Sequence, residues 1–106
     1  MVSFQDFKKM DIRIAVIKDV KDHPNADKLF IVNCDTGTEE KQVVAGIKDS
    51  YKPEELIGKK VVVITNLEPA TIRGVESHAM ILAAKDDNTL SVLVPEKEIK
   101  TGTKIS

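Results

Sequence analysis

The sequence predicts an all-β fold, a small barrel of five short strands with one helix inserted between the third and the fourth. Short runs rich in β-branched residues alternate with turn residues, which is typical of a small and strongly twisted sheet. One segment, residues 51–58, instead combines the start and stop signals of a short helix. A chain of 106 residues with 42% hydrophobic content is sufficient for one core, so we expect one domain.

The first ten residues predict a short helical arm. Ser3 is a suitable N-cap because the acidic residue Asp6 follows it three positions later. Phe4 and Phe7 lie on the same face of such a helix. We therefore expect an arm over residues 1–10 that has one apolar side.

The first strand is predicted over residues 11–20, where side chains alternate between two faces. One face carries the apolar residues Ile12, Ile14 and Val16. A structured loop over residues 22–28 should follow, because Pro24 restrains His23 to an extended conformation. The second and third strands are predicted over residues 28–33 and 41–46. The connection between them contains Gly37, which can adopt a positive φ.

Residues 51–58 predict the helix between the third and fourth strands. Pro53 stands in its first turn, and Gly58 stands just past its end. The fourth strand is expected over residues 59–65, where a β-branched run begins, and the fifth over residues 80–84. A further strand is expected over residues 90–94, and Pro95 ends regular pairing.

Three strands, one helix and two strands favour a partly open Greek-key barrel of the oligonucleotide and oligosaccharide binding (OB) type. We divide the chain into a helical arm (1–10), the barrel (11–84) and a C-terminal extension (85–106). Apolar residues of the arm and the extension lie outside the predicted five-strand core. They are Phe4, Phe7, Leu90, Val92, Leu93, Val94, Ile99 and Ile105. Such a surface needs cover in so small a fold, which predicts a homodimer.

The segment from Asn66 to Ala84 contains the best candidate for a functional site. It is a polar loop held between two apolar strands, and loops fixed by a sheet commonly bind ligands. It has an Arg-Gly pair and hydrogen-bonding side chains, but no carboxylate pair and no nucleophile beside a base. This content predicts a recognition surface and not an enzyme, with no cofactor.

Two residue types limit the other chemistry that we expect. Cys34 is the single cysteine, so an internal disulfide is excluded and a packed thiol is expected. His23 has no cysteine or second histidine near it in sequence, so we expect it to shape its loop by hydrogen bonding and predict no metal site.

The charge balance excludes a strongly basic nucleic-acid binder. The formal net charge is −1, with 31% charged residues of both signs. A local cluster of lysine and arginine can still contact phosphates. No apolar run approaches the length of a membrane span, and the first residues lack a basic leader, so we expect a soluble, cytoplasmic protein with no membrane partner.

Several separated motifs occur together in one order. They are Asp11-Ile12-Arg13, His23-Pro24-Asn25-Ala26-Asp27-Lys28-Leu29, Val43-Val44-Ala45-Gly46, Asn66-Leu67-Glu68-Pro69, and Arg73-Gly74 with Ser77 and Met80. In this combination the chain resembles the tRNA-binding domain of methionyl-tRNA synthetases, of the C-terminal or β-subunit type. The resemblance implies an OB-fold that dimerises and recognises tRNA by shape. Such a domain serves the synthetase as an appendage or as a separate, non-catalytic subunit.

From the residue types together with the resemblance we predict seven RNA-binding residues, namely Arg13, Lys28, Asn66, Arg73, Ser77, His78 and Met80. Lys28 and Arg73 are suited to phosphate, and Arg73 can also stack on a base. Arg13 has two equal readings, a contact in the binding groove or a cover over apolar surface. Asn66 and Ser77 have the alternative role of satisfying local backbone groups.

His78 can stack on a base or face water, and Met80 can touch ligand or belong to the core. The loop also departs from the family pattern, because Glu68, Ala70 and Thr71 stand where many members have lysine. This difference predicts weaker RNA binding or a changed ligand.

A second function remains open. A related group of OB-fold proteins associated with protein export shares the type of opening around Asp11-Ile12-Arg13 and the type of ending at Gly102-Thr103-Lys104-Ile105. That likeness implies a dimeric, chaperone-like protein that binds polypeptide. The motif from His23 to Leu29 and the Arg73-Gly74 pair favour the synthetase type.

Overall fold

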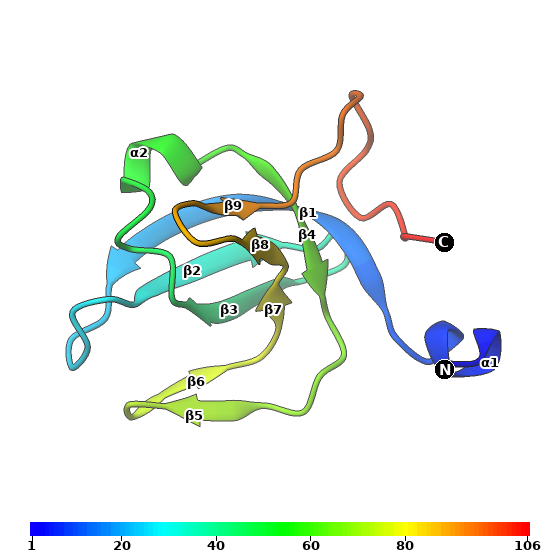
Figure 1. The fold of residues 1–106 in the computed structure, drawn as a ribbon, viewed down its shortest axis with the longest axis horizontal. Coiled ribbons are helices and arrows are strands. Elements are labelled where there is room, and N and C mark those ends of the chain that lie inside the picture. The colour runs from blue at the N-terminus through cyan, green and yellow to red at the C-terminus, as the bar shows by residue number, and fades with distance from the viewer.

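The longest strand, β1 (Ile12–Asp22), lies at the centre of a five-stranded antiparallel sheet with the order β3-β2-β1-β4-β7. Its neighbours are β2 (Phe30–Asp35) and β4 (Lys60–Ile64), while β3 (Glu40–Ala45) and β7 (Met80–Ile81) form the two ends. This computed structural model describes all residues from 1 to 106 (Figure 1). The sheet and its order confirm the predicted all-β barrel of the OB type.

The sheet curls because β1 changes partner along its length. Its first half, from Ile12 to Val16, pairs with β4, and its second half, from Val16 to Asp22, pairs with β2. A bulge between Ile17 and Asp19 shifts the register with β2, and such a bulge bends a strand and increases its twist. The strand therefore crosses from one side of the barrel to the other.

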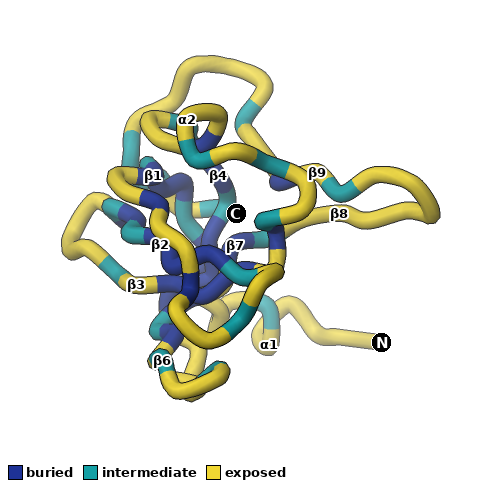
Figure 2. The backbone as a smooth tube through the Cα atoms, turned by 90° about the vertical axis from the view of Figure 1, so that its left-hand side faces the viewer, coloured by how far each residue is buried: buried dark blue, intermediate teal, exposed yellow.

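The hydrophobic core lies inside this curled sheet. Figure 2 shows that most of the buried residues lie on the strands of the sheet. The side chains of Phe30, Val32, Val61 and Val63 are almost completely buried. Cys34 is a free, buried thiol, and burial raises its pKa to about 12, so it remains protonated near neutral pH.

Both predicted helices form, and both are shorter than expected. Helix α1 (Phe4–Lys8) begins at Ser3, whose Oγ accepts a hydrogen bond from the Asp6 N–H at 3.1 Å, as its sequence predicts. Helix α2 (Pro53–Leu56) buries Leu56 completely in the core. Neither helix has the length or the apolar content needed to cross a membrane.

The second strand begins two residues later than predicted, at Phe30. The preceding residues turn back on β1, since the Leu29 N–H donates to the Ala26 carbonyl at 3.5 Å and the His23 N–H donates to the Leu29 carbonyl at 3.2 Å. Lys28 therefore lies in the loop between β1 and β2, which we call the β1–β2 loop (residues 23–29).

The polar segment after β4 is a hairpin and not an irregular loop. It forms β5 (Ala70–Ile72) and β6 (Val75–Ser77), joined by Arg73 and Gly74. These two residues have φ angles of 52° and 86°, and a two-residue hairpin turn of this kind needs positive φ at both positions. The segment was predicted as a polar loop held between two strands, and the two short strands within it were not predicted, because their turn needs Arg73 in a conformation that arginine seldom takes.

The predicted fifth strand is divided. Residues Met80 and Ile81 pair with β4, whereas β8 (Ala83–Lys85) pairs with β9 (Leu90–Val92). Between them the Leu82 N–H donates to the Val62 carbonyl, and the Leu93 N–H donates to the Leu82 carbonyl. The chain thus leaves the main sheet at Leu82 and begins a separate hairpin.

The C-terminal extension belongs to the fold. Val92 is buried in the core and Leu90 packs against it, so the prediction that these two residues lie outside the core was wrong. Residues 102–105 run along the first half of β1 through hydrogen bonds to the backbone of Ile12 and Ile14. The extension still exposes Leu93, Val94 and Ile99.

Candidate nucleic-acid interface

The β1–β2 loop and the tip of the β5–β6 hairpin meet beyond the end of β1, on the left of Figure 1. His23 connects them and is only 5% exposed. Its Nδ1 accepts a hydrogen bond from the Asn25 N–H at 3.0 Å, and its Nε2 lies 2.9 Å from the Ile72 carbonyl oxygen. Because Nδ1 is an acceptor here, Nε2 carries the proton and donates it to Ile72.

Asn25 and Arg73 add a second connection between the two loops. The Arg73 Nη2 donates to the Asn25 carbonyl at 2.9 Å, and the Asn25 Nδ2 donates to the Arg73 carbonyl at 3.4 Å. These contacts hold the arginine in its left-handed conformation. Only one of the five N–H groups of the guanidinium is used in the pair, so the others remain available to a ligand.

A hollow of about 390 Å³ lies between these loops. Its lining residues are Asn25, Ala26, Asp27, Lys28, Leu29 and Arg73. The fold thus brings together Lys28 and Arg73, the two residues that the sequence predicts as phosphate contacts. Asp27 also lines the hollow, so its lining residues carry two positive charges and one negative charge.

Ser77 anchors the hairpin to the sheet. It is buried, and its Oγ accepts a hydrogen bond from the Val44 N–H at 3.0 Å and donates to the Ala79 carbonyl at 3.1 Å. Nearby, the Gln42 side chain donates to the Glu76 carbonyl at 2.8 Å. The structure therefore places the Ser77 hydroxyl inside the protein, where it satisfies backbone groups.

His78 and Met80 lie at the surface beside the base of the hairpin. The His78 Nε2 is 3.4 Å from a carboxylate oxygen of Glu76, and the Met80 residue is 44% exposed. Met80 borders a small, mainly apolar hollow of about 160 Å³. The other lining residues are Val44, Leu67, Glu68, Ala70, Ile72, Ser77 and Ala79. The exposure of Met80 excludes its assignment to the core.

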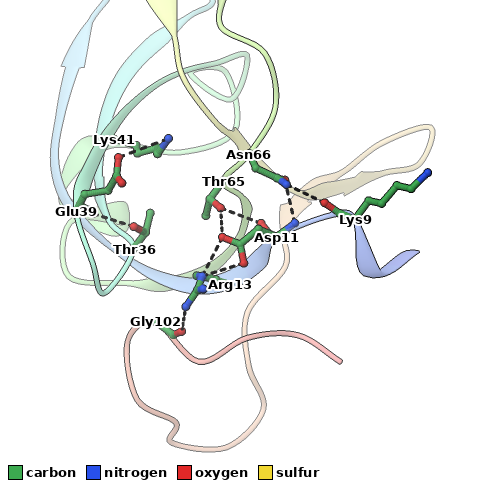
Figure 3. Close-up of polar contacts among 9 residues, drawn as sticks. All are labelled: Lys9, Asp11, Arg13, Thr36, Glu39, Lys41, Thr65, Asn66 and Gly102. Carbon is green, nitrogen blue, oxygen red and sulfur yellow. Dashed lines mark hydrogen bonds and ion pairs between the residues drawn. The ribbon is translucent and has the colours of Figure 1, made fainter. Parts of the chain in front are cut away.

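Arg13 and Asn66 lie near the start of β1 and do not line the hollow between the loops. Figure 3 shows both side chains beside Asp11. The Arg13 Nε donates to the Asp11 carboxylate at 3.0 Å, and its Nη1 donates to the Gly102 carbonyl at 3.0 Å. The Asn66 Oδ1 accepts from the Asp11 N–H at 2.9 Å, and its Nδ2 donates to the Lys9 carbonyl at 2.8 Å. Both side chains connect the arm and the C-terminal segment to the barrel.

Asp11 is the centre of this junction. Its carboxylate accepts hydrogen bonds from Arg13 and from the hydroxyl of Thr65, and these bonds lower its pKa below the ordinary value of 3.8. The seven predicted site residues are thus divided. Lys28, Arg73, His78 and Met80 lie at the loops and the hairpin and have side chains that are exposed or partly free, whereas the side chains of Arg13, Asn66 and Ser77 make hydrogen bonds that connect separate segments of the fold.

From the sequence, His23 was predicted only to shape its own loop. The hydrogen bonds of Asn25 to Arg73 in the other loop were not predicted. The contact from His23 to Ile72 spans 49 positions of sequence, so periodicity carries no signal for it. The available signal was the Arg-Gly pair, which fits the two central positions of a hairpin turn.

Comparison with known proteins identifies the family. The pattern of a family described as "Putative tRNA binding domain" matches residues 12–104. The chain is 54% identical over 104 residues to the methionine–tRNA ligase of Pyrococcus horikoshii, covering 98% of this chain and 14% of that protein. It is 47% identical over 105 residues to the methionine–tRNA ligase of Thermotoga maritima, of which it covers 17%.

Solved structures share the whole fold. A MetRS related protein from Pyrococcus horikoshii has a TM-score of 0.91 at 29% identity, with 100% of this chain and 98% of that chain covered. The chaperone CsaA from Bacillus anthracis has a TM-score of 0.88 at 31% identity, with 100% and 99% covered. The chain spans only a small part of the ligases but the full length of these small proteins. By sequence and by fold, it belongs to the family of tRNA-binding domains related to methionyl-tRNA synthetase.

Proposed function

We propose that this chain binds tRNA by its shape and phosphate backbone, with Lys28 and Arg73 as the principal contacts. The observation that carries the proposal is the hollow between the β1–β2 loop and the hairpin, which both side chains line. Lysine and arginine are the usual phosphate ligands in protein–RNA contacts. His78 and Met80 extend the surface toward the base of the hairpin.

Folded RNA suits this surface better than an unpaired strand. Single-strand binding on OB-folds depends on exposed aromatic rings that stack on bases. Here Phe30 is buried in the core, and the Tyr51 hydroxyl accepts a hydrogen bond from the Val92 N–H at 3.0 Å. Phe4 is exposed, but it belongs to the arm.

A binding competition tests this function. Labelled tRNA should be displaced by unlabelled tRNA at a much lower concentration than by an RNA hairpin of one short stem, because only the folded tRNA offers phosphates over a wide surface. Equal competition by the two RNAs would contradict recognition by shape.

The cellular role that we propose is to assist a methionyl-tRNA synthetase in the cytoplasm, as an appended domain or as a β-type subunit. Catalysis then resides in the synthetase, and this domain raises the local concentration of tRNA. Addition of the domain should lower the KM for tRNA with little change in kcat. A change in kcat alone would argue against this role.

We also propose that the single domain of residues 1–106 forms a homodimer through the arm and the C-terminal residues. A hollow of about 250 Å³ lies between them, lined by Phe4, Phe7, Lys8, Met10, Lys104, Ile105 and Ser106. Phe4 is 68% exposed and Met10 38%, so their burial in a second copy would be favourable. Light scattering at micromolar concentration should give twice the chain mass for the native protein and less for Phe4→Asp; a monomeric native protein would refute the dimer.

A second candidate is a chaperone-like dimer that binds unfolded polypeptide. The likeness to CsaA favours it, together with the apolar hollow beside Met80 and Leu67. The acidic residue Glu68, which lines this hollow, would suit a peptide with basic residues better than a phosphate. Retention of a permanently unfolded model protein, with no retention of tRNA, would reverse the order of the two candidates.

A further inference from the structure

We propose that the hollow between the β1–β2 loop and the hairpin is a preorganised phosphate subsite in which His23 and Asn25 are positioning residues for Arg73. They hold its guanidinium so that, together with Lys28, it binds one phosphate of the RNA backbone, and Asp27 weakens that binding. This inference rests on the proposed tRNA binding and adds the residues that build and limit the site.

His23 fixes the position of the hairpin tip. The imidazole is buried, and both of its ring nitrogens are used, one by the backbone of its own loop and one by the Ile72 carbonyl. Ile72 directly precedes Arg73. Because each ring nitrogen bonds to the backbone of a different loop, the imidazole cannot rotate freely. The rigid ring therefore fixes the distance between the two loops.

Arg73 needs this support because its backbone is in the left-handed region. That conformation places Cβ close to the carbonyl oxygen and is unfavourable for a residue other than glycine. Two hydrogen bonds with Asn25, one to the Arg73 backbone and one from its guanidinium, oppose a return to the common conformation. The arginine is thus held before any ligand arrives, which reduces the entropy lost on binding.

The charges in the hollow identify the ligand as an anion. The Arg73 guanidinium is held by one hydrogen bond, from its Nη2 to the Asn25 carbonyl, and Lys28 lines the same hollow. A phosphate can accept hydrogen bonds from both cations at once. Asp27 also lines the hollow, and its negative charge repels a phosphate, so the subsite is weaker than its two cations alone would make it.

The positioning role is tested by the dependence of tRNA affinity on salt. Each phosphate contact contributes a slope of about 0.7 to 0.9 to the fall of log affinity with log salt concentration. Arg73→Met should reduce the slope by about this amount. His23→Leu should reduce the slope similarly, because Arg73 is then no longer held in place. The imidazole that this variant removes is neutral, so the loss of slope does not come from a lost charge on residue 23.

Rescue separates positioning from general damage to the fold. His23→Gln keeps an N–H donor near Nε2 and should retain most of the slope, whereas His23→Asn is too short to reach Ile72 and should lose it. The double variant with His23→Leu and Arg73→Met should bind tRNA no more weakly than Arg73→Met alone. If His23→Leu does not fold, the comparison of His23→Gln with His23→Asn provides the same test.

Asp27 has a matched control in Asp87, an exposed carboxylate in the β8–β9 turn. Asp27→Asn should strengthen tRNA binding about two- to five-fold at low salt, the range of a surface charge interaction. Asp87→Asn changes the net charge equally and should have a clearly smaller effect.

Three results would overturn the inference. The first is a native slope in Arg73→Met, or a loss of slope in Arg73→Met with no loss in His23→Leu or His23→Asn, and the second is an equal effect of Asp27→Asn and Asp87→Asn. The third is failure of the unaltered protein to bind tRNA in a salt-dependent way, which would remove the proposed function as well. The first two leave tRNA binding intact, so the two kinds of failure are distinguishable.

Discussion

Gly37 and Gly102 approach each other backbone to backbone, so that a Cβ on Gly37 would come within 2.6 Å of the Gly102 Cα. Gly37 lies in the turn between β2 and β3, and Gly102 lies in the C-terminal segment along β1. Both have φ angles in the left-handed region, 95° and 90°. This contact joins the C-terminal extension to the barrel, and a side chain at Gly37 would push the two segments apart.

Gly37→Ala should therefore destabilise the protein more than Gly58→Ala. Gly58 also has a positive φ, but a Cβ there would meet nothing within 4 Å, so its substitution isolates the conformational cost, about 1 to 2 kcal/mol. Gly37→Ala adds the clash and should cost about 1 to 3 kcal/mol more. Urea unfolding measures both variants, and equal free energies of unfolding would contradict the close contact.

The Asp11 junction predicts a loss of stability in acid. Because the pKa of Asp11 in the folded protein is lowered from 3.8, its contribution is complete above the unfolded pKa and is lost as pH falls through the folded pKa. Asp11→Asn should flatten the dependence of unfolding free energy on pH below about pH 4. Asp87→Asn, at an exposed turn, serves as the control, and an unchanged pH dependence in Asp11→Asn would argue against the junction.

Ser77→Ala should lower stability and leave tRNA affinity unchanged. Loss of the Ser77 hydroxyl would deprive the buried Val44 N–H of its acceptor, which costs about 1 to 3 kcal/mol of stability. The free energy of unfolding and the tRNA dissociation constant of the folded protein measure the two effects separately. A large loss of affinity without a loss of stability would instead support a direct RNA contact by Ser77.

Arg13→Met should release the C-terminal segment without removing a phosphate contact. The guanidinium donates to Asp11 and to the Gly102 carbonyl, so its loss should increase hydrogen exchange at the Gly102 and Ile105 amides, which bond to β1. The slope of tRNA affinity against salt should stay at the native value. A fall in that slope by about 0.7 to 0.9 would show that Arg13 contacts phosphate.

The parts of the fold that depend on local sequence could be predicted. Periodicity places β1 and β4, and Ser3 and Pro53 mark the starts of the two helices, because each signal involves residues only a few positions apart. The split after Ile81 could not be predicted in this way. It depends on the hydrogen bonds of the Leu82 backbone to Val62 and Leu93, which are distant from it or lie beyond a turn in the sequence.

The candidate site shows the same limit. Lys28 and Arg73 follow from residue type and from likeness to a family, but their common hollow depends on His23 reaching Ile72 across the fold. Arg13, Asn66 and Ser77 have the same donor and acceptor groups that an RNA contact would need. Only the three-dimensional structure shows that those groups already have partners inside the protein.

The most direct test of tRNA binding by this chain is a titration of tRNA with purified protein over a series of salt concentrations. Binding through several phosphates predicts a steep linear fall of log affinity with log salt, and Lys28→Met and Arg73→Met should each reduce the slope by about 0.7 to 0.9. Affinity that does not change with salt, or a native slope in both variants, would contradict phosphate recognition at the hollow between the β1–β2 loop and the hairpin.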